Sequence, residues 1–283
     1  MTPPPMTGAL VRLEGLSVAF PDRSRKPLFG RAPMVEVVHG VDLEIPRGAA
    51  LGLVGESGSG KTTIGRALVR LVKPSGGALV YDGVDIAGWD EDRLHPLRAR
   101  LQMIFQDPQS SLNPRLTIGT TLQRPLEAFG RGGDRAGRRR RVAELLETVG
   151  LPAAFAGRYP HELSGGQRQR IGIARALALE PEFIVADEIV SGLDVSSQAQ
   201  ILLLLRRLQA ELNLTLVFIS HDLSVVRVLC DRVAVLSAGR VVEAGETAAV
   251  FADPKHAYTR ELLTSVPLPE IEDGWIMAEV PAG

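Results

Sequence analysis

The sequence predicts an α/β protein with a mainly parallel sheet. Three apolar runs are typical of strands buried on both faces: ALGLVG at 50–55, FIVADE at 183–188 and LTLVFISHD at 214–222. Helical patterns lie between these runs, in GKTTIGRALVRLV after the first and SSQAQILLLLRRLQAEL after the second. Strands that alternate with helices favour a sheet whose strands run parallel.

The remaining segments add further strands and a helical stretch. Residues 11–54 contain the period-2 alternation of short strands in LVRLEGLSVAF and VHGVDLEI. Residues 78–105 return to strand character around the polar, helical EDRLHPLRAR. From about 116 to 180 the pattern is helical, and RVAVLSAGRVVEAG predicts a strand pair that turns at Ala238-Gly239.

Composition and charge exclude several classes of protein. The chain has 283 residues, of which 45% are hydrophobic and 23% charged, as in ordinary globular proteins. Its net charge of −1 argues against a dedicated nucleic-acid-binding protein, which usually has a basic excess. Cys230 is the only cysteine, which excludes a disulfide framework and a multi-thiolate metal site. Its apolar surroundings predict a buried side chain.

The N-terminus and the apolar runs indicate where the protein acts. MTPPPMTGALVRLEG has neither the charged region nor the apolar core of a signal peptide. The run ILLLL at 201–205 ends at Arg206-Arg207, far short of the ~18 apolar residues that a membrane span needs. We therefore expect a cytoplasmic chain that can lie against a membrane through a partner.

A phosphate-binding loop follows the first buried strand. The pattern G-x-x-x-x-G-K-[ST] is matched at every position, between a strand and a helix, where such a loop is expected. Backbone N–H groups and the helix N-terminus would surround phosphates, while a lysine neutralises them and a threonine hydroxyl binds Mg²⁺. A chance glycine turn is the alternative, and the strand context disfavours it. The predicted nucleotide-binding residues are Gly55, Glu56, Ser57, Gly58, Ser59, Gly60, Lys61, Thr62 and Thr63.

Polar side chains at the ends of other apolar strands complete a predicted hydrolytic site. Asp187 ends a buried strand and can hold Mg²⁺, while Glu188 can orient and polarise a water that attacks the γ-phosphate. His221 is a candidate to contact the γ-phosphate, and Gln106 can bind Mg²⁺ as a further ligand. Taken alone, the acidic pair would be a helix cap and the histidine a surface residue, but behind a phosphate loop both indicate catalysis.

A second glycine-containing segment, LSGGQ at 163–167, also precedes a helix. It presents N–H groups and a positive helix end, but no lysine follows it. We interpret it as a phosphate-binding helix N-terminus that closes over ATP bound by a second subunit. Two head-to-tail subunits would then enclose two nucleotides between them. The residues assigned to this contact are Ser164, Gly165, Gly166 and Gln167.

In order and spacing these motifs resemble the nucleotide-binding subunit of an ABC transporter, over nearly the whole chain. The resemblance implies a P-loop NTPase core with a mainly parallel sheet, an antiparallel β subdomain and a helical subdomain at about 116–180. It implies an ATPase domain over 1–245 and a C-terminal tail over 246–283. It also implies that Asp194, in the turn SGLD, contacts the other subunit. An upstream aromatic residue would stack on adenine, and Phe29 is the predicted one.

Three stretches resemble ATPase subunits of oligopeptide, dipeptide and nickel importers: FQDPQSSLNPRLTIG at 105–119, the loop GESGSGKTT, and HAYTRELLTSVPLP at 256–269. The resemblance implies ATP and Mg²⁺ as cofactors. It implies a second ATPase subunit, either a different chain or, as the alternative, another copy of this one, together with two membrane-spanning permease subunits and an extracytoplasmic solute-binding protein as partners. Since the chain lacks a cysteine cluster, it resembles the second ATPase subunit of such a pair. It would lie on the cytoplasmic face of the membrane.

Two positions depart from the family pattern, and alternative functions stay open. Ile189 stands where the family has proline and Gly192 where it has alanine, which puts turnover and intersubunit coupling in doubt but deletes no catalytic group. The alternatives are a soluble ABC protein of DNA repair or translation and a catalytically silent partner in a heterodimer. The identity of the solute also stays open. The resemblance favours a peptide, and the alternative is that the same machinery imports nickel, glutathione or another solute.

Overall fold

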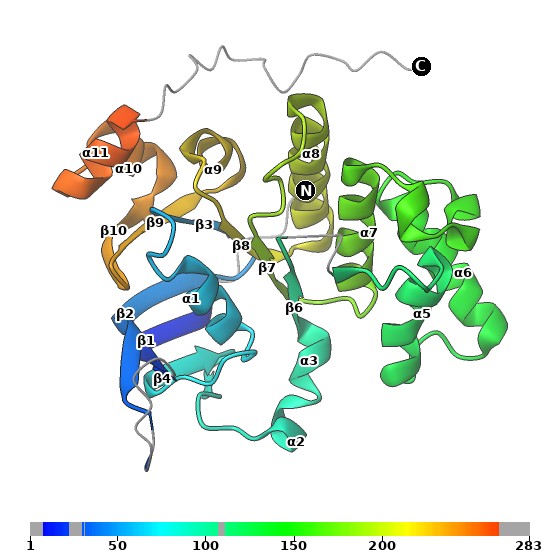
Figure 1. Ribbon diagram of the computed structural model, residues 1–283, viewed down its shortest axis with the longest axis horizontal. Helices are drawn as coiled ribbons and strands as arrows, with labels where there is room; N and C mark the ends of the chain where they lie inside the picture. The colour runs from blue at the N-terminus through cyan, green and yellow to red at the C-terminus, as the bar shows by residue number, and fades with distance from the viewer. Residues whose placement is uncertain (1–7, 23–29, 31, 107–110, 266–283) are drawn as a thin grey trace.

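Two β-sheets organise the chain, and helices cover them (Figure 1). The structure, a computed structural model, describes residues 8–22, 30, 32–106 and 111–265. Both sheets and the helical region have the character predicted from the sequence, which confirms an α/β fold with a mainly parallel sheet.

The larger sheet is parallel except at one edge. Its neighbouring strands pair in parallel register from β9 to β6, whereas β10 runs antiparallel to β9. Three of the strands, β3, β7 and β8, are buried at every residue, as their uninterrupted apolar sequences require. In spatial order the strands are β10 (Arg240–Glu246), β9 (Arg232–Ser237), β3 (Ala50–Val54), β8 (Thr215–Ile219), β7 (Phe183–Asp187) and β6 (Leu101–Ile104).

The smaller sheet is antiparallel and is built mostly from the N-terminal part of the chain. The two long strands alternate buried and exposed residues because only one face of the sheet packs on the core. Its apolar face shares a hydrophobic cluster with the helix that follows β3. In spatial order the strands are β2 (Met34–Pro46), β1 (Ala9–Pro21), β4 (Gly76–Tyr81) and β5 (Val84–Asp85).

Helices pack around the sheets in three groups. The first group comprises α1 (Lys61–Leu68), which contacts both sheets, α2 (Glu91–Leu94), and α3 (Leu97–Arg100), which contacts β6. A second group, green in Figure 1, packs beside β6: α5 (Ile118–Ala128), α6 (Arg135–Thr148), the 3-10 turns η2 (Ala153–Gly157) and η3 (Pro160–Glu162), and α7 (Gly165–Leu177). The C-terminal group contains α8 (Val195–Leu212), α9 (Leu223–Leu229), α10 (Thr247–Ala252) and α11 (Ala257–Ser265).

Cys230 is buried, as its apolar surroundings predicted. The strand pair β9–β10 turns at Ala238-Gly239, also as predicted. The domain boundaries at 245 and at about 116 and 180 stay predictions, and the end of the tail, 266–283, lies outside the described residues.

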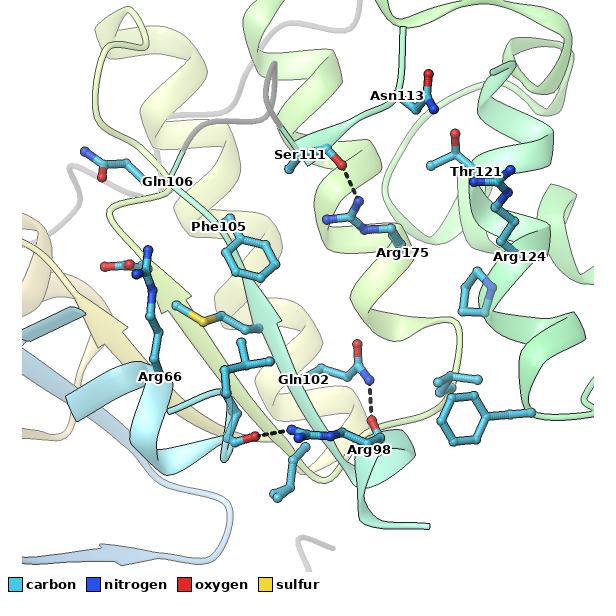
Figure 2. Close-up of a pocket in the computed structure, with 18 of the residues that line it drawn as sticks. Arg66, Arg98, Gln102, Phe105, Gln106, Ser111, Asn113, Thr121, Arg124 and Arg175 are labelled. Atoms are coloured by element: carbon cyan, nitrogen blue, oxygen red, sulfur yellow. Dashed lines mark hydrogen bonds between the residues drawn. The ribbon is translucent and has the colours of Figure 1, made fainter. Parts of the chain in front are cut away.

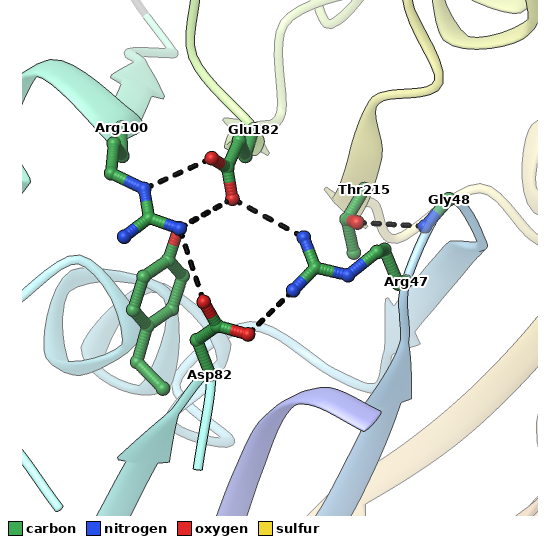
Figure 3. A network of polar contacts seen from close by, with 7 residues as sticks. Arg47, Gly48, Asp82, Arg100, Glu182 and Thr215 are labelled. Carbon is green, nitrogen blue, oxygen red and sulfur yellow. Dashed lines mark hydrogen bonds and ion pairs between the residues drawn. The ribbon is translucent and has the colours of Figure 1, made fainter. Parts of the chain in front are cut away.

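A network of charged side chains joins the two sheets at the edge where the parallel strands begin (Figure 3). Glu182, just before β7, accepts hydrogen bonds from Arg100 at 2.8 and 3.0 Å and from Arg47 at 3.3 Å. Arg47 and Arg100 also donate to Asp82, in the β4–β5 turn, at 2.6 and 3.2 Å. Since Arg47 directly follows β2 and Asp82 directly follows β4, the network joins the small sheet to the start of β6 and β7 in the larger one.

The network makes part of the stability dependent on pH. Hydrogen bonds from Arg100 lower the pKa of Glu182, so its stabilising contribution is present above the ordinary glutamate value of about 4.3 and is lost as the pH falls through the folded-state pKa. Because the group is partly exposed, we expect Glu182→Gln to cost about 1 kcal/mol of unfolding free energy at pH 7. Urea unfolding at pH 7 and at steps below 4.5 checks this. The difference from wild type should shrink in acid, and a difference independent of pH would contradict it.

Candidate functional site

The phosphate loop lies between β3 and α1, at the carboxyl end of the central strand. Gly55 has φ = +148°, and a Cβ atom there would lie 2.1 Å from the carbonyl oxygen of Leu236. Gly60, the N-cap of α1, has φ = +103°. Both conformations are rarely open to other residues, so the glycines are needed for the loop to turn against β9 and enter the helix.

Lys61, the first residue of α1, lies folded over this loop. Its side chain is buried, and its Nζ donates to the carbonyl oxygens of Gly55 at 2.8 Å and Glu56 at 2.7 Å. Burial lowers the pKa of the ammonium group, while the nearby carboxylates of Glu188 and Asp187 oppose that shift. The loop therefore holds a cation at a helix N-terminus, which is the arrangement that attracts phosphate.

Thr62 and Asp187 meet beside this lysine. The hydroxyl of Thr62 donates to Asp187 Oδ1 at 3.1 Å. Asp187 ends β7 and is only 2% exposed; burial raises the pKa of its carboxyl, and the bond from Thr62 works in the opposite direction. Within the described part of the chain, no cluster of three His, Cys, Asp or Glu side chains is arranged to hold a metal. A cation at this place would instead use carboxylate, hydroxyl and amide oxygens, the ligands that suit Mg²⁺.

Glu188 lies between Gln106 and His221. Its Oε2 accepts a hydrogen bond from Gln106 Nε2 at 2.9 Å, and its Oε1 lies 3.6 Å from His221 Nδ1. These residues come from the ends of β6, β7 and β8, which are neighbours in the sheet. The Glu188 backbone is left-handed, with φ = +47°, and its N–H donates to the carbonyl of Ile219. Such a conformation in a non-glycine residue is strained and is concentrated at functional sites.

The LSGGQ segment forms the start of α7. Ser164 is the N-cap: its hydroxyl accepts the N–H of Gln167, and the Gln167 side chain accepts the N–H of Ser164. This reciprocal pair is a capping box. A Cβ on Gly165 would lie 3.2 Å from Leu193, and one on Gly166 would lie 3.2 Å from Ser197. Close packing on the start of α8 is thus a second reason for glycine at these positions, besides the predicted phosphate contact.

The turn before α8 also has a local role. Asp194 is the N-cap of α8 and accepts the N–H and the hydroxyl of Ser197 at 2.9 and 2.7 Å. These hydrogen bonds, with the N–H bond the larger cause, lower the pKa of its carboxyl. Its predicted contact with another subunit stays a prediction. Of the two unusual residues, Ile189 is buried in the core, whereas Gly192 has φ = +75° and open space around it.

Comparison with known proteins assigns the family. A family model described as "ABC transporter" matches residues 38–191, more than half of the chain. The chain belongs to the ABC transporter family. A peptide import ATP-binding protein of Brucella ovis is 52% identical over 240 residues, covering 85% of this chain and 75% of that one. An oligopeptide transport ATP-binding protein of Bacillus subtilis is 50% identical over 246 residues, covering 86% and 75%.

Solved ABC structures have the same fold. The ATP-binding cassette MJ0796, in a dimeric post-hydrolysis state with ADP and Pi, aligns with a TM-score of 0.73 and 32% identity, covering 84% of this chain and 98% of that one. CbiO1 from Clostridium perfringens, part of an ABC transporter complex, aligns with a TM-score of 0.73 and 28% identity, covering 87% and 91%. No helix in the described part of this chain is both long and apolar enough to span a membrane.

A cavity of about 820 Å³ separates the ABC core from the second group of helices (Figure 2). Phe105 and Leu71 line it and are 37% and 51% exposed. Gln106 lies at its rim, and in Figure 2 the Gln106 side chain points away from Arg175 on the opposite wall. The cavity is rich in cations, contributed by Arg66, Arg98, Arg124 and Arg175.

Sequence reasoning missed one residue at the phosphate loop of this ABC protein. The hydroxyl of Tyr258, on α11, accepts the N–H of Glu56 at 3.0 Å. The stretch 256–269 was noted only for its resemblance to importer tails, and no sequence pattern pairs it with the loop. Phe29, the predicted adenine-stacking residue, and residues 107–110 of the importer-like stretch lie outside the described residues.

Proposed function

We propose that this chain binds and hydrolyses ATP to power an ABC importer and that the imported solute is a peptide. The convergence of Gln106, Glu188 and His221 beside the phosphate loop carries the hydrolytic part of this proposal. The names of the Brucella ovis and Bacillus subtilis relatives, for peptide import and oligopeptide transport, support the transport part and the cargo.

The nucleotide would lie across the phosphate loop. Its phosphates would accept hydrogen bonds from the loop N–H groups, and Lys61 would neutralise the β- and γ-phosphates. Thr62, Asp187 and Gln106 would hold Mg²⁺, because their hydroxyl, carboxylate and amide oxygens suit that ion. When bound, Mg²⁺ would supply positive charge to the phosphate oxygens. The pair formed by Thr62 and Asp187 already aligns two of these oxygens.

Glu188 is the proposed general base. A carboxylate at this place can accept a proton from a water aligned for attack on the γ-phosphate. Gln106 and His221 contact the two carboxylate oxygens from opposite sides and so restrict its rotation. His221 is exposed, which leaves its ring accessible to a γ-phosphate.

The second half of each site would come from another ATPase subunit. The packing of α7 against α5, α6, α8 and β6 leaves Ser164 exposed at the helix N-terminus. That helix end would contact the γ-phosphate of ATP on the facing subunit, with Asp194 near the same interface. We propose a different chain as the partner, with a second copy of this chain as the alternative.

The cavity in Figure 2 is the proposed contact with a permease subunit. Its exposed apolar side chains and its arginines fit a short amphipathic segment that carries acidic residues. Gln106 links the rim of this cavity to Glu188, so a permease movement would be felt at the catalytic carboxylate. In this proposal the chain lies at the cytoplasmic face of the membrane, in a complex with two permease subunits and an extracytoplasmic solute-binding protein.

Uptake by cells that carry variants of the chain tests the function. Glu188→Gln is expected to abolish uptake of labelled di- and oligopeptides, because the importer would no longer complete its cycle. Arg124→Glu should also reduce uptake, by repelling an acidic permease segment, whereas Arg139→Glu, on the exposed surface of α6, should not. Unchanged peptide uptake in the Glu188→Gln cells would contradict peptide as the cargo. Loss of nickel or glutathione uptake in those cells would then assign the alternative solute.

A further inference from the structure

A carboxylate on β10, the antiparallel edge strand of the larger sheet, binds the start of helix α11. Glu243, on β10, accepts the N–H groups of Lys255 at 2.8 Å and His256 at 3.0 Å, just before the helix begins. The ring of His256 then accepts the N–H of Tyr258 at 3.2 Å. Figure 1 shows α11 close to α10 and β10. The importer-like sequence H-A-Y-T-R therefore starts a helix whose position on the sheet is fixed.

This attachment brings Tyr258 to the phosphate loop. Its half-buried ring packs against the hydrophobic cluster that includes Val250 and Leu229. Its hydroxyl accepts the N–H of Glu56 at 3.0 Å, across 202 positions of sequence. The hydroxyl thus contacts the phosphate loop between β3 and α1.

The bonded N–H belongs to a peptide group that also contacts Lys61. The carbonyl of Gly55 and the N–H of Glu56 form one planar unit, so neither can rotate without the other. The carbonyl accepts from Lys61 Nζ at 2.8 Å, while the N–H donates to Tyr258. Because Gly55 has no side chain, its backbone dihedral angles are only weakly restricted. A hydrogen bond from Tyr258 can therefore restrain the rotation of this peptide unit.

We propose that Tyr258 is a positioning residue for Lys61. By holding the 55–56 peptide, it keeps the Gly55 carbonyl turned toward the ammonium group and so sets where that cation meets the nucleotide phosphates. This inference rests on the proposed ATP-binding function. It gives the importer-type tail a role within the ATP site of its own chain.

Tyr258→Phe tests this inference, because it keeps the ring and removes only the hydroxyl. We expect the Kd for Mg-ATP to rise about 3- to 10-fold, the size of one lost hydrogen bond. Hydrogen exchange at the Glu56 amide should become faster, and the melting temperature without nucleotide should fall by no more than about 2–4 °C. Binding of AMP, which lacks the β- and γ-phosphates, should be unchanged.

The control is Thr264→Val on the same helix, whose hydroxyl donates to the Arg260 and Glu261 carbonyls of α11. It should leave both the Kd and the Glu56 exchange at wild-type values. An unchanged Kd for Mg-ATP in Tyr258→Phe would overturn the inference, even if exchange is faster. An equal loss of AMP binding would overturn it as well. If wild-type protein does not bind Mg-ATP at all, the proposed function fails, which is a distinguishable result.

Discussion

Glu188→Gln is expected to hydrolyse ATP at least about 100-fold more slowly than wild type, as removal of a general base predicts. The amide is nearly the same size as the carboxylate and can still lie between Gln106 and His221, so the fold and ATP binding should be retained. Phosphate release at saturating Mg-ATP measures the rate, and equilibrium titration measures the affinity.

A matched control for this variant is Glu211→Gln, an exposed position near the far end of α8. It should hydrolyse ATP at the wild-type rate. A rate for Glu188→Gln within a few-fold of wild type would mean that another group accepts the proton, and the proposed catalytic assignment would be wrong.

Lys61→Ala is expected to remove most of the affinity for Mg-ATP. The buried ammonium group is the cation held at the loop, and its loss also leaves the Gly55 and Glu56 carbonyls without their donor. In wild type, Mg-ATP at 100 times its Kd should stabilise the fold by about 2.7 kcal/mol. That corresponds to a rise of roughly 4–6 °C in melting temperature for a chain of this size. In Lys61→Ala the rise at the same concentration should nearly disappear.

Lys73→Ala, an exposed lysine beyond α1, is the control and should keep the full rise. Lys61→Ala must first be shown to melt near the wild-type temperature without nucleotide. A full Mg-ATP shift in Lys61→Ala would contradict the assignment of the phosphate site to this loop.

The sequence predicted which polar residues would lie together at the candidate site because of how parallel strands are built. Uninterrupted apolar runs identified β3, β7 and β8, and the polar residues that follow such strands must gather at one edge of the sheet. To predict that Gln106 and His221 approach Glu188, the order of the strands in the sheet must also be known. Because β7 lies between β6 and β8, both residues reach the same carboxylate.

Other features depend on contacts that periodicity does not encode. An apolar pattern shows which face of an element is buried, but not which distant polar atom it meets. The bond between Tyr258 and Glu56, and the joining of both sheets by Glu182, arise only when remote segments are folded together. The LSGGQ glycines show a related limit: phosphate binding was predicted from their position before a helix, whereas their packing on Leu193 and Ser197 needed the structure.

We propose that Glu188 drives hydrolysis of ATP held at this phosphate loop. The most direct test incubates purified wild type and Glu188→Gln with Mg-ATP, removes free nucleotide and identifies what stays bound. We predict ADP on wild type and intact ATP on the variant, at comparable occupancy. ADP on both proteins, formed at similar rates, would contradict the claim.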